Sequence, residues 1–76
     1  MHKTQTIYQI RIWCSNDNCT EFWYDKELSD YYANRDDAEK ELSKYNNLTP
    51  SQLERECKVI CVGENKPYIE TFTLRL

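Results

Sequence analysis

Apolar and polar residues alternate with a period of two near both ends of the chain. In Thr6–Cys14 one face of the expected strand carries the apolar side chains, namely Tyr8, Ile10, Ile12 and Cys14. Tyr68–Leu76 alternates in the same way, with Tyr68, Phe72, Leu74 and Leu76 on one face and Glu70 as an interruption. This pattern is typical of β-strands that bury one face. Residues 15–18 are turn-forming, so Thr20–Asp25 is expected to form a hairpin with the first strand, with Phe22 and Tyr24 on one face.

The middle of the chain has the period of a helix. Asn34 is placed as an N-cap, and the next residues, Asp36 and Asp37, put negative charge in the first turn, where the helix dipole favours it. One apolar stripe follows at helical spacing, formed by Ala38, Leu42 and Tyr45. Asn46 and Asn47 then predict the end of this helix.

A second, shorter helix is predicted directly afterwards. Thr49 can cap it, Pro50 suits its first position, and Gln52 completes a capping box, which predicts a helix over Pro50–Arg55. Glu56–Val62 has the composition of a third strand, and residues 63–67 contain the single glycine and predict a hairpin loop into the last strand.

These elements follow the order ββα(α)ββ and predict an α+β fold. The expected architecture is a small antiparallel sheet built from two hairpins, with one main helix and a short second helix packed on one face. We expect residues 1–76 to form a single small domain, because a chain of 76 residues is near the lower size limit for folding alone. Because it begins with Met1 and ends in an apolar, strand-like segment, we expect the chain to be a complete small protein.

Negative charge is concentrated in the middle of the sequence. Nine of the 13 acidic residues lie between Asp17 and Glu41, where there are only three basic residues but five aromatic ones. Aromatic side chains anchor protein interfaces and charge steers association, so this segment is a candidate contact surface. An acidic surface can also mimic nucleic-acid phosphates in the basic groove of a target, although many charge runs only keep a protein soluble. The candidate binding residues are Trp13, Trp23, Asp25, Glu27, Asp30, Asp36, Asp37, Glu39 and Glu41.

The two tryptophans are the sharpest candidates within this set. Trp13 shares a strand face with Arg11, and Trp23 shares one with Glu21, so both rings point away from the face that the helices are expected to cover. Exposed tryptophan with a polar rim is typical of an interface hot spot. Two alternatives stay open at this point: the rings stack on one another across the strands, or a second copy of the chain covers this face in a homodimer.

The four cysteines lie in two pairs that are close in the sequence, Cys14 with Cys19 and Cys57 with Cys61. Free, packed thiols are expected, since the chain has no export signal and cytosolic thiols stay reduced. A disulfide between Cys14 and Cys19 and a zinc site formed by all four are the alternatives. The zinc site is disfavoured because the spacings differ from zinc knuckles, and because residues four apart on a predicted strand are about 13 Å apart.

The residues needed for catalysis are scarce. The single histidine, His2, lies at the terminus, where it is a poor general base, and the lone glycine cannot form a phosphate-binding loop. We therefore expect no enzymatic activity, no cofactor and no resident metal. No apolar run reaches the roughly 20 residues that span a bilayer, and residues 1–20 lack the apolar core of a signal peptide, which predicts a cytoplasmic protein that does not enter membranes.

A net charge of −3 disfavours nonspecific binding to nucleic acid. The alternative function is nevertheless a nucleic-acid-binding or regulatory domain, in which aromatic rings on the sheet stack on bases and Arg11, Lys58 and Arg75 meet phosphates. The rings available for stacking are Tyr8, Trp13, Trp23 and Tyr68.

The preferred function is a small acidic, non-catalytic protein-binding module. The chain opens with Ile7-Tyr8-Gln9-Ile10-Arg11-Ile12-Trp13 and carries a capped Glu/Lys helix. In size and composition it resembles the small accessory proteins of phages and mobile elements. That resemblance implies a protein that binds and inhibits a host factor, anti-defence inhibitors included. It covers no diagnostic motif, so it assigns no role to any residue.

Overall fold

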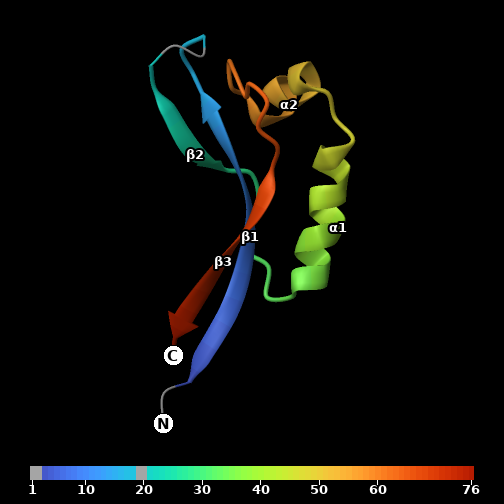
Figure 1. The fold of residues 1–76 in the computed structure, drawn as a ribbon. Coiled ribbons are helices and arrows are strands. Elements are labelled where there is room, and N and C mark those ends of the chain that lie inside the picture. Colours follow the sequence, from blue (N-terminus) through green and yellow to red (C-terminus); the bar gives the residue numbers. More distant parts are fainter. Residues whose placement is uncertain (1–2, 19–20) are drawn as a thin grey trace.

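The computed structural model describes residues 3–18 and 21–76 as three strands and two helices (Figure 1). The elements are β1 (Thr4–Ser15), β2 (Trp23–Glu27), α1 (Arg35–Asn46), α2 (Pro50–Cys57) and β3 (Tyr68–Arg75). The fold is α+β with an antiparallel sheet, as predicted. The predictions for His2, Cys19 and Thr20 lie outside the described residues.

The sheet has the strand order β2-β1-β3, and β1 is its long central strand. The C-terminal part of β1 pairs with β2, from Arg11 opposite Glu27 to Ser15 opposite Trp23. The N-terminal part of β1 pairs with β3, from Thr4 opposite Arg75 to Arg11 opposite Tyr68. Because β2 and β3 pair with different halves of β1, the sheet is drawn out into a molecule of 48 × 26 × 16 Å. Its lower half in Figure 1 is a two-stranded ribbon of β1 and β3 that extends beyond α1.

Local capping interactions fix the start of both helices. The side-chain oxygen of Asn34 accepts a hydrogen bond from the backbone N–H of Asp36 at 2.8 Å. At α2 the N–H of Gln52 donates to the Thr49 hydroxyl at 3.2 Å, and the N–H of Thr49 donates to the Gln52 side chain at 2.8 Å. Both predicted caps are therefore confirmed, and α2 extends beyond its predicted end to Cys57.

The predicted third strand, Glu56–Val62, is wrong. Cys57 is instead the last residue of α2. It lies one helical turn after Leu53, and both side chains are buried on the same side of the helix. Lys58 then adopts a left-handed conformation with φ 57° and reverses the chain. The loop that follows forms only one isolated β-bridge with the sheet, between Cys61 and Ser15, and otherwise packs against it through side chains such as Val59 and Val62. The sheet consequently has three strands in the order ββααβ, and β3 pairs with β1 instead of closing a second hairpin.

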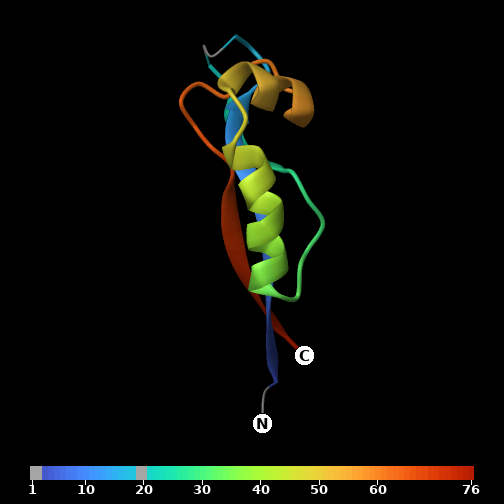
Figure 2. The same ribbon diagram turned by 90° about the vertical axis from the view of Figure 1, so that its right-hand side faces the viewer.

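Both helices pack on one face of the sheet, and β1 contributes every second side chain to the core. The buried cluster joins residues of β1, α2 and the following loop, namely Ile12, Cys14, Leu53, Cys57, Val59 and Val62. Figure 2 shows α1 lying over this face, with the 28–34 loop on one side of the helix and β3 on the other. Phe22 does not join Tyr24 there, because it precedes β2 and is 72% exposed.

Side chains that are directly opposite in an antiparallel pair lie on the same face, so the register also defines the face turned away from the helices. We call this surface the open face. It consists of Gln5, Ile7, Gln9, Arg11, Trp13, Ser15, Trp23, Asp25, Glu27, Tyr68, Glu70, Phe72 and Leu74.

Candidate functional site: the open face of the sheet

Four of the predicted binding residues come together on the open face. Trp13 lies opposite Asp25, and the neighbouring positions of β2 on the same face are Trp23 and Glu27. Strand alternation was the signal for the two tryptophans, whereas Asp25 and Glu27 were named from the concentration of acidic residues. Sequence reasoning named Tyr68 only as a stacking surface and missed its place beside Asp25, because that contact depends on β3 pairing with β1.

A hydrogen-bond network holds the centre of the open face. The Arg11 guanidinium donates from Nε to Asp25 Oδ2 at 2.7 Å and from Nη2 to the Asp25 backbone oxygen at 3.1 Å. The Tyr68 hydroxyl donates to the other carboxylate oxygen, Oδ1, at 2.6 Å. Arg11 also donates to Gln9 Oε1 at 2.6 Å, and Gln9 in turn donates to the carbonyl of Ser29 at 3.0 Å. Asp25 thus connects all three strands of the sheet.

The carboxylates of this network raise the pKa values of both donors, Arg11 and Tyr68. Burial by itself lowers the pKa of Arg11, but the hydrogen bond to Asp25 and the charges of Asp25 and Glu27 raise it above its ordinary value. Burial, the hydrogen bond to Asp25 and the charge of that carboxylate raise the pKa of Tyr68 to about 12. Tyr68 therefore stays a protonated hydrogen-bond donor at every physiological pH.

Replacing Tyr68 should have an effect that depends on alkaline pH. The pKa of Tyr68 is raised on folding, so its protonated phenol stabilises the native state below about pH 10 and loses this contribution as the pH rises through about 12. We expect Tyr68→Phe to unfold at lower urea than the wild type at pH 8, and the difference to shrink between pH 10 and 12. Tyr31→Phe is the control, because the Tyr31 hydroxyl donates no hydrogen bond to a described residue. If the difference in urea midpoint between the wild type and Tyr68→Phe stays constant from pH 10 to 12, the Tyr68 hydroxyl does not have the raised pKa assigned to it.

The two tryptophans occupy one end of the open face but have different surroundings. Trp13 is 46% exposed. Trp23 is half-buried against the loop after α2, where a Cβ added to Gly63 would lie 3.2 Å from Trp23 Cη2. Gly63 also has φ +58°, a conformation that residues with a Cβ rarely adopt, so both the contact and the backbone favour glycine there. Trp13 is the ring that a partner can reach.

The alternative in which the tryptophans stack on each other is wrong. Trp13 lies opposite Asp25 and Trp23 lies opposite Ser15, so the rings occupy diagonal positions. Within the described part of the chain the aromatic pair on this face is instead Tyr31 with Phe72, whose ring centroids are 5.7 Å apart in an edge-to-face arrangement.

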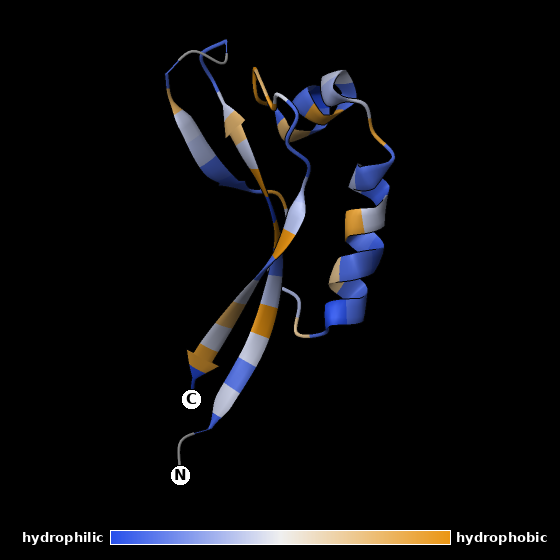
Figure 3. Cartoon of the chain, in the orientation of Figure 1, coloured by the Kyte–Doolittle hydropathy of each residue, from blue (hydrophilic) through white to orange (hydrophobic). Residues whose placement is uncertain are grey.

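The other end of the open face is apolar and lies on the ribbon. Tyr31 reaches over the edge of β1 to Phe72, and Ile7 lies directly opposite Phe72 in the register. Leu74 continues the row and is 43% exposed. Figure 3 shows this apolar end of β3 in orange, in the part of the ribbon that no helix covers.

The remaining acidic candidates lie elsewhere. Asp30 is in the exposed loop before α1, and the four acids of α1 are on the helix that covers the opposite face of the sheet. Two of these four acids are paired within the helix: Glu39 with Arg35 at 3.1 Å and Glu41 with Lys44 at 3.0 Å. The acidic segment therefore does not form one continuous surface with the tryptophans.

Glu41 also lines a pocket of about 260 Å³ between the end of α1 and α2. The other lining residues are Lys44, Tyr45, Leu48 and Glu56. Lys44 is held by Glu41, and burial raises the pKa of Tyr45, so both side chains keep their protons at neutral pH. The pocket has no contact with the open face.

The cysteines correct two predictions. Cys14 and Cys57 are free, buried thiols, and burial raises the pKa of both. The alternative of a Cys14–Cys19 disulfide is therefore wrong. Cys61 is disulfide-bonded, so the free thiol expected there is also wrong. Cys57 is helical, which removes the premise that it shares a strand with Cys61, and within residues 3–18 and 21–76 no group of three or more His, Cys, Asp or Glu residues is arranged to hold a metal ion.

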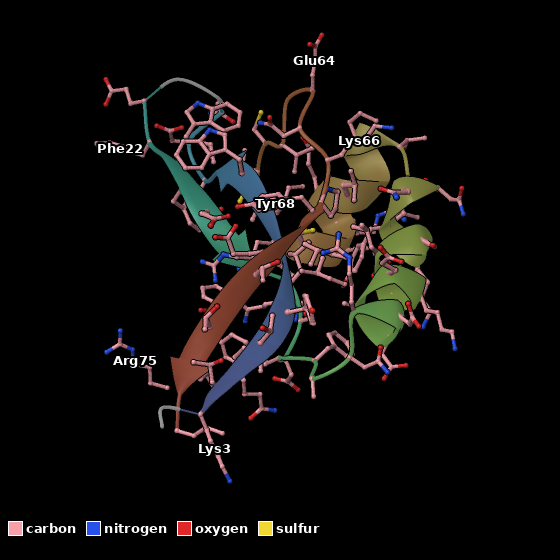
Figure 4. The ribbon with its side chains drawn as sticks, turned by 60° about the horizontal axis from the view of Figure 1, so that its bottom comes forward. Lys3, Phe22, Glu64, Lys66, Tyr68 and Arg75 are labelled. Carbon is pink, nitrogen blue, oxygen red and sulfur yellow. The ribbon has the colours of Figure 1, made fainter. Side chains whose placement is uncertain are left out.

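The basic residues named for nucleic-acid binding are separated from one another. Arg11 is neutralised by Asp25 on the open face, and Lys58 caps the end of α2. Arg75 lies with Lys3 at the free tip of the ribbon, away from Tyr68 at its base (Figure 4). Among the rings, Tyr8 is on the face covered by α1, where the Arg35 guanidinium lies 5.8 Å from its ring centroid.

No helix in the described part of the chain is long and apolar enough to cross a membrane. The open face presents an exposed tryptophan, a fixed charged network and an apolar row on one surface. We found no family model, no curated protein and no solved structure that matches this chain.

Proposed function

We propose that this chain is a non-catalytic protein-binding module that acts by occupying a partner's surface with its open face. The observation that carries the proposal is the exposed Trp13 ring beside the hydrogen-bonded Arg11–Asp25–Tyr68 network. Tryptophan, tyrosine and arginine are the residue types enriched in interface hot spots. A network that is already ordered also loses little side-chain entropy when a partner binds.

The charge of the open face favours a basic partner segment. Three carboxylates lie on it, those of Asp25, Glu27 and Glu70, against the single guanidinium of Arg11. Arg11 lies between Asp25 at 2.7 Å and Glu27 at 3.7 Å, which leaves a net negative surface beside Trp13. Complementary charge of this kind increases the association rate and selects against acidic partners.

The proposed biological role is inhibition of a host factor, anti-defence inhibition included, in a cytoplasmic setting. Its support is the resemblance in size and composition to small accessory proteins of phages and mobile elements. The disulfide at Cys61 weighs against a reducing compartment. Mimicry of nucleic acid by the acids of α1 is the less favoured route, because basic residues pair with two of the four within the helix.

The test compares variants of the two surfaces. Immobilised wild-type protein, Trp13→Ala and the double variant Asp36→Lys/Asp37→Lys are incubated with a lysate of the source cell. A candidate partner must be retained by the wild type and the α1 variant and lost from Trp13→Ala. It is then purified, and its dissociation constant is measured for each variant. We expect Trp13→Ala to weaken binding about 30-fold or more, and the α1 variant to leave it within about threefold.

Two outcomes contradict this proposal. Loss of binding on charge reversal at Asp36 and Asp37, with Trp13→Ala unaffected, transfers the site to α1. Retention of labelled single-stranded DNA or RNA at low salt, abolished by Trp13→Ala, favours the alternative nucleic-acid function instead. Circular dichroism of each variant shows that it is folded before binding is compared.

A further inference from the structure

The outer edge of β3 presents a row of unpaired backbone groups. The N–H of Leu76 donates to the carbonyl of Lys3 at 2.8 Å and continues the β1–β3 register. Hydrogen-bonded and non-hydrogen-bonded pairs alternate in an antiparallel ladder, so the even-numbered residues of β3 direct their N–H and C=O groups toward β1. The odd-numbered residues, Ile69, Thr71, Thr73 and Arg75, direct their N–H and C=O groups outward. No described residue forms a backbone hydrogen bond with these outward-facing groups.

This edge lacks the features that usually protect edge strands from pairing. Residues 68–75 contain no proline and no lysine, and only Glu70 and Arg75 are charged. β3 is eight residues long, and its register with β1 contains no bulge. Its β-branched and aromatic residues favour extended structure. A long, regular, weakly charged edge is a template for another strand.

We propose that a second copy of this chain pairs with this edge, so that two β3 strands run antiparallel in a symmetric dimer. The register follows from the backbone groups. When Ile69 lies opposite Arg75 of the second copy and Thr71 opposite its Thr73, all four outward-facing residues are hydrogen-bonded on both strands. Shifting the register by two residues in either direction leaves one of the four without a partner. The two-fold axis then passes beside Phe72.

The side chains agree with this register. Phe72 lies opposite its own copy in a non-hydrogen-bonded pair, the kind in which side chains approach most closely. On the same face Leu74 lies opposite Glu70 and Leu76 opposite Tyr68, so no two like charges are opposed. Most of the negative charge, in residues 17–41, is on other parts of the molecule. The apolar row formed by the half-buried Phe72 and the exposed Leu74 becomes the centre of the joint surface.

The dimer contains one continuous six-stranded sheet. Its two-fold axis is perpendicular to the sheet, so both open faces lie on the same side and both Trp13 rings remain exposed. Two identical sites on one rigid surface bind a repeated or dimeric partner more tightly than one site does. The dimer itself does not depend on the proposed function, since it is formed by backbone groups of β3.

A matched pair of proline variants tests the assignment. Thr73 and Thr6 are directly opposite each other in the ribbon, and both are exposed. The backbone N–H of Thr73 points out from the β3 edge, whereas that of Thr6 points out from the β1 edge, so neither variant removes a hydrogen bond between β1 and β3. Thr73→Pro blocks the proposed interface, and Thr6→Pro makes the same change on the other edge.

Sedimentation equilibrium gives the result. We expect the wild type to reach twice the chain mass of 9.2 kDa with increasing concentration. Thr73→Pro should weaken dimerisation more than about tenfold, and Thr6→Pro should change it less than about threefold. A wild type that stays monomeric up to about 1 mM overturns the proposal. So does a dimer that Thr6→Pro disrupts as strongly as Thr73→Pro, or one that Trp13→Ala abolishes, since the latter is a dimer through the open face.

Amide hydrogen exchange checks the register independently of any substitution. In the dimer the amides of Ile69, Thr71, Thr73 and Arg75 should all gain protection as the concentration rises, while Thr4 and Thr6 should not. Protection of Thr71 and Thr73 without Ile69 or Arg75 contradicts the register proposed here.

Discussion

Replacing Ile12 by alanine should lower the free energy of unfolding by about 2–5 kcal/mol. Ile12 has no exposed surface and lies in the core cluster with Leu53 and Val62, so the smaller side chain leaves a cavity under both helices. Small domains have total stabilities near the lower end of about 5–15 kcal/mol, so this single change is expected to leave a large unfolded fraction. Urea unfolding followed by tryptophan fluorescence measures the loss.

Ile60→Ala is the matched control for this prediction. Ile60 is the same residue type, but it is 51% exposed in the loop after α2. Its truncation should cost less than about 1 kcal/mol, because most of its surface already contacts water. Equal losses at the two positions would show that the helices do not cover the face of β1 that carries Ile12.

Replacing Asp25 by alanine should cost about 1–3 kcal/mol and should loosen the open face. The change removes acceptors at 2.7 Å from Arg11 and at 2.6 Å from the Tyr68 hydroxyl. The Arg11 side chain is only 16% exposed, so it cannot fully replace its partner with water. Because the Asp25 side chain is 34% exposed, solvent screening keeps the loss toward the lower part of this range. Urea unfolding measures the change.

Glu27→Ala provides the comparison within the same site. Glu27 also approaches Arg11, but at 3.7 Å and with a side chain that is 63% exposed. Its removal should cost less than about 0.5 kcal/mol, as for most exposed ion pairs. A double-mutant cycle with Arg11→Ala isolates the Arg11–Asp25 coupling from the individual losses. A coupling no larger than that of Arg11 with Glu27 would contradict the central role given to Asp25.

The same residues therefore support both the fold and the proposed binding surface. Asp25 joins β2 to β1 and β3 through side-chain hydrogen bonds, and it lies opposite the exposed Trp13. Variants of Asp25 would change stability and binding together. Trp13→Ala removes a ring that is nearly half exposed and forms no hydrogen bond or aromatic pair with a described residue. This is why the binding experiment uses Trp13 and the stability experiment uses Asp25.

Elements governed by short-range interactions could be predicted from the sequence. The Asn34 cap and the Thr49–Gln52 capping box each join residues at most three positions apart, so their geometry depends little on the rest of the molecule. The alternation of β1 likewise separated its buried apolar residues from Arg11 and Trp13, because successive side chains of a strand point to opposite faces. The place of Trp13 on the open face followed from this one rule.

The wrong predictions share a different cause. The spacing of the buried residues in Cys57–Val62 is compatible with a strand, and also with the end of a helix followed by a packed loop. The second arrangement forms because it packs these residues against Ile12 and Cys14. The acidic segment looked continuous in the sequence. In the structure Asp25 and Glu27 of β2 lie on the open face of the sheet, whereas α1 covers the other face, so the acids of α1 are separated from them.

The sequence by itself determined the two helix starts, the presence of a long first strand and the faces on which the apolar and polar residues of that strand lie. Each of these depends on side-chain spacing or on hydrogen bonds between near neighbours. Only the tertiary structure decided that β3 pairs with the N-terminal half of β1, and this pairing places Tyr68 beside Asp25 and leaves an edge of β3 open. Strand pairing between residues about 60 positions apart depends on closing a long loop around a common core, and no local pattern encodes its outcome.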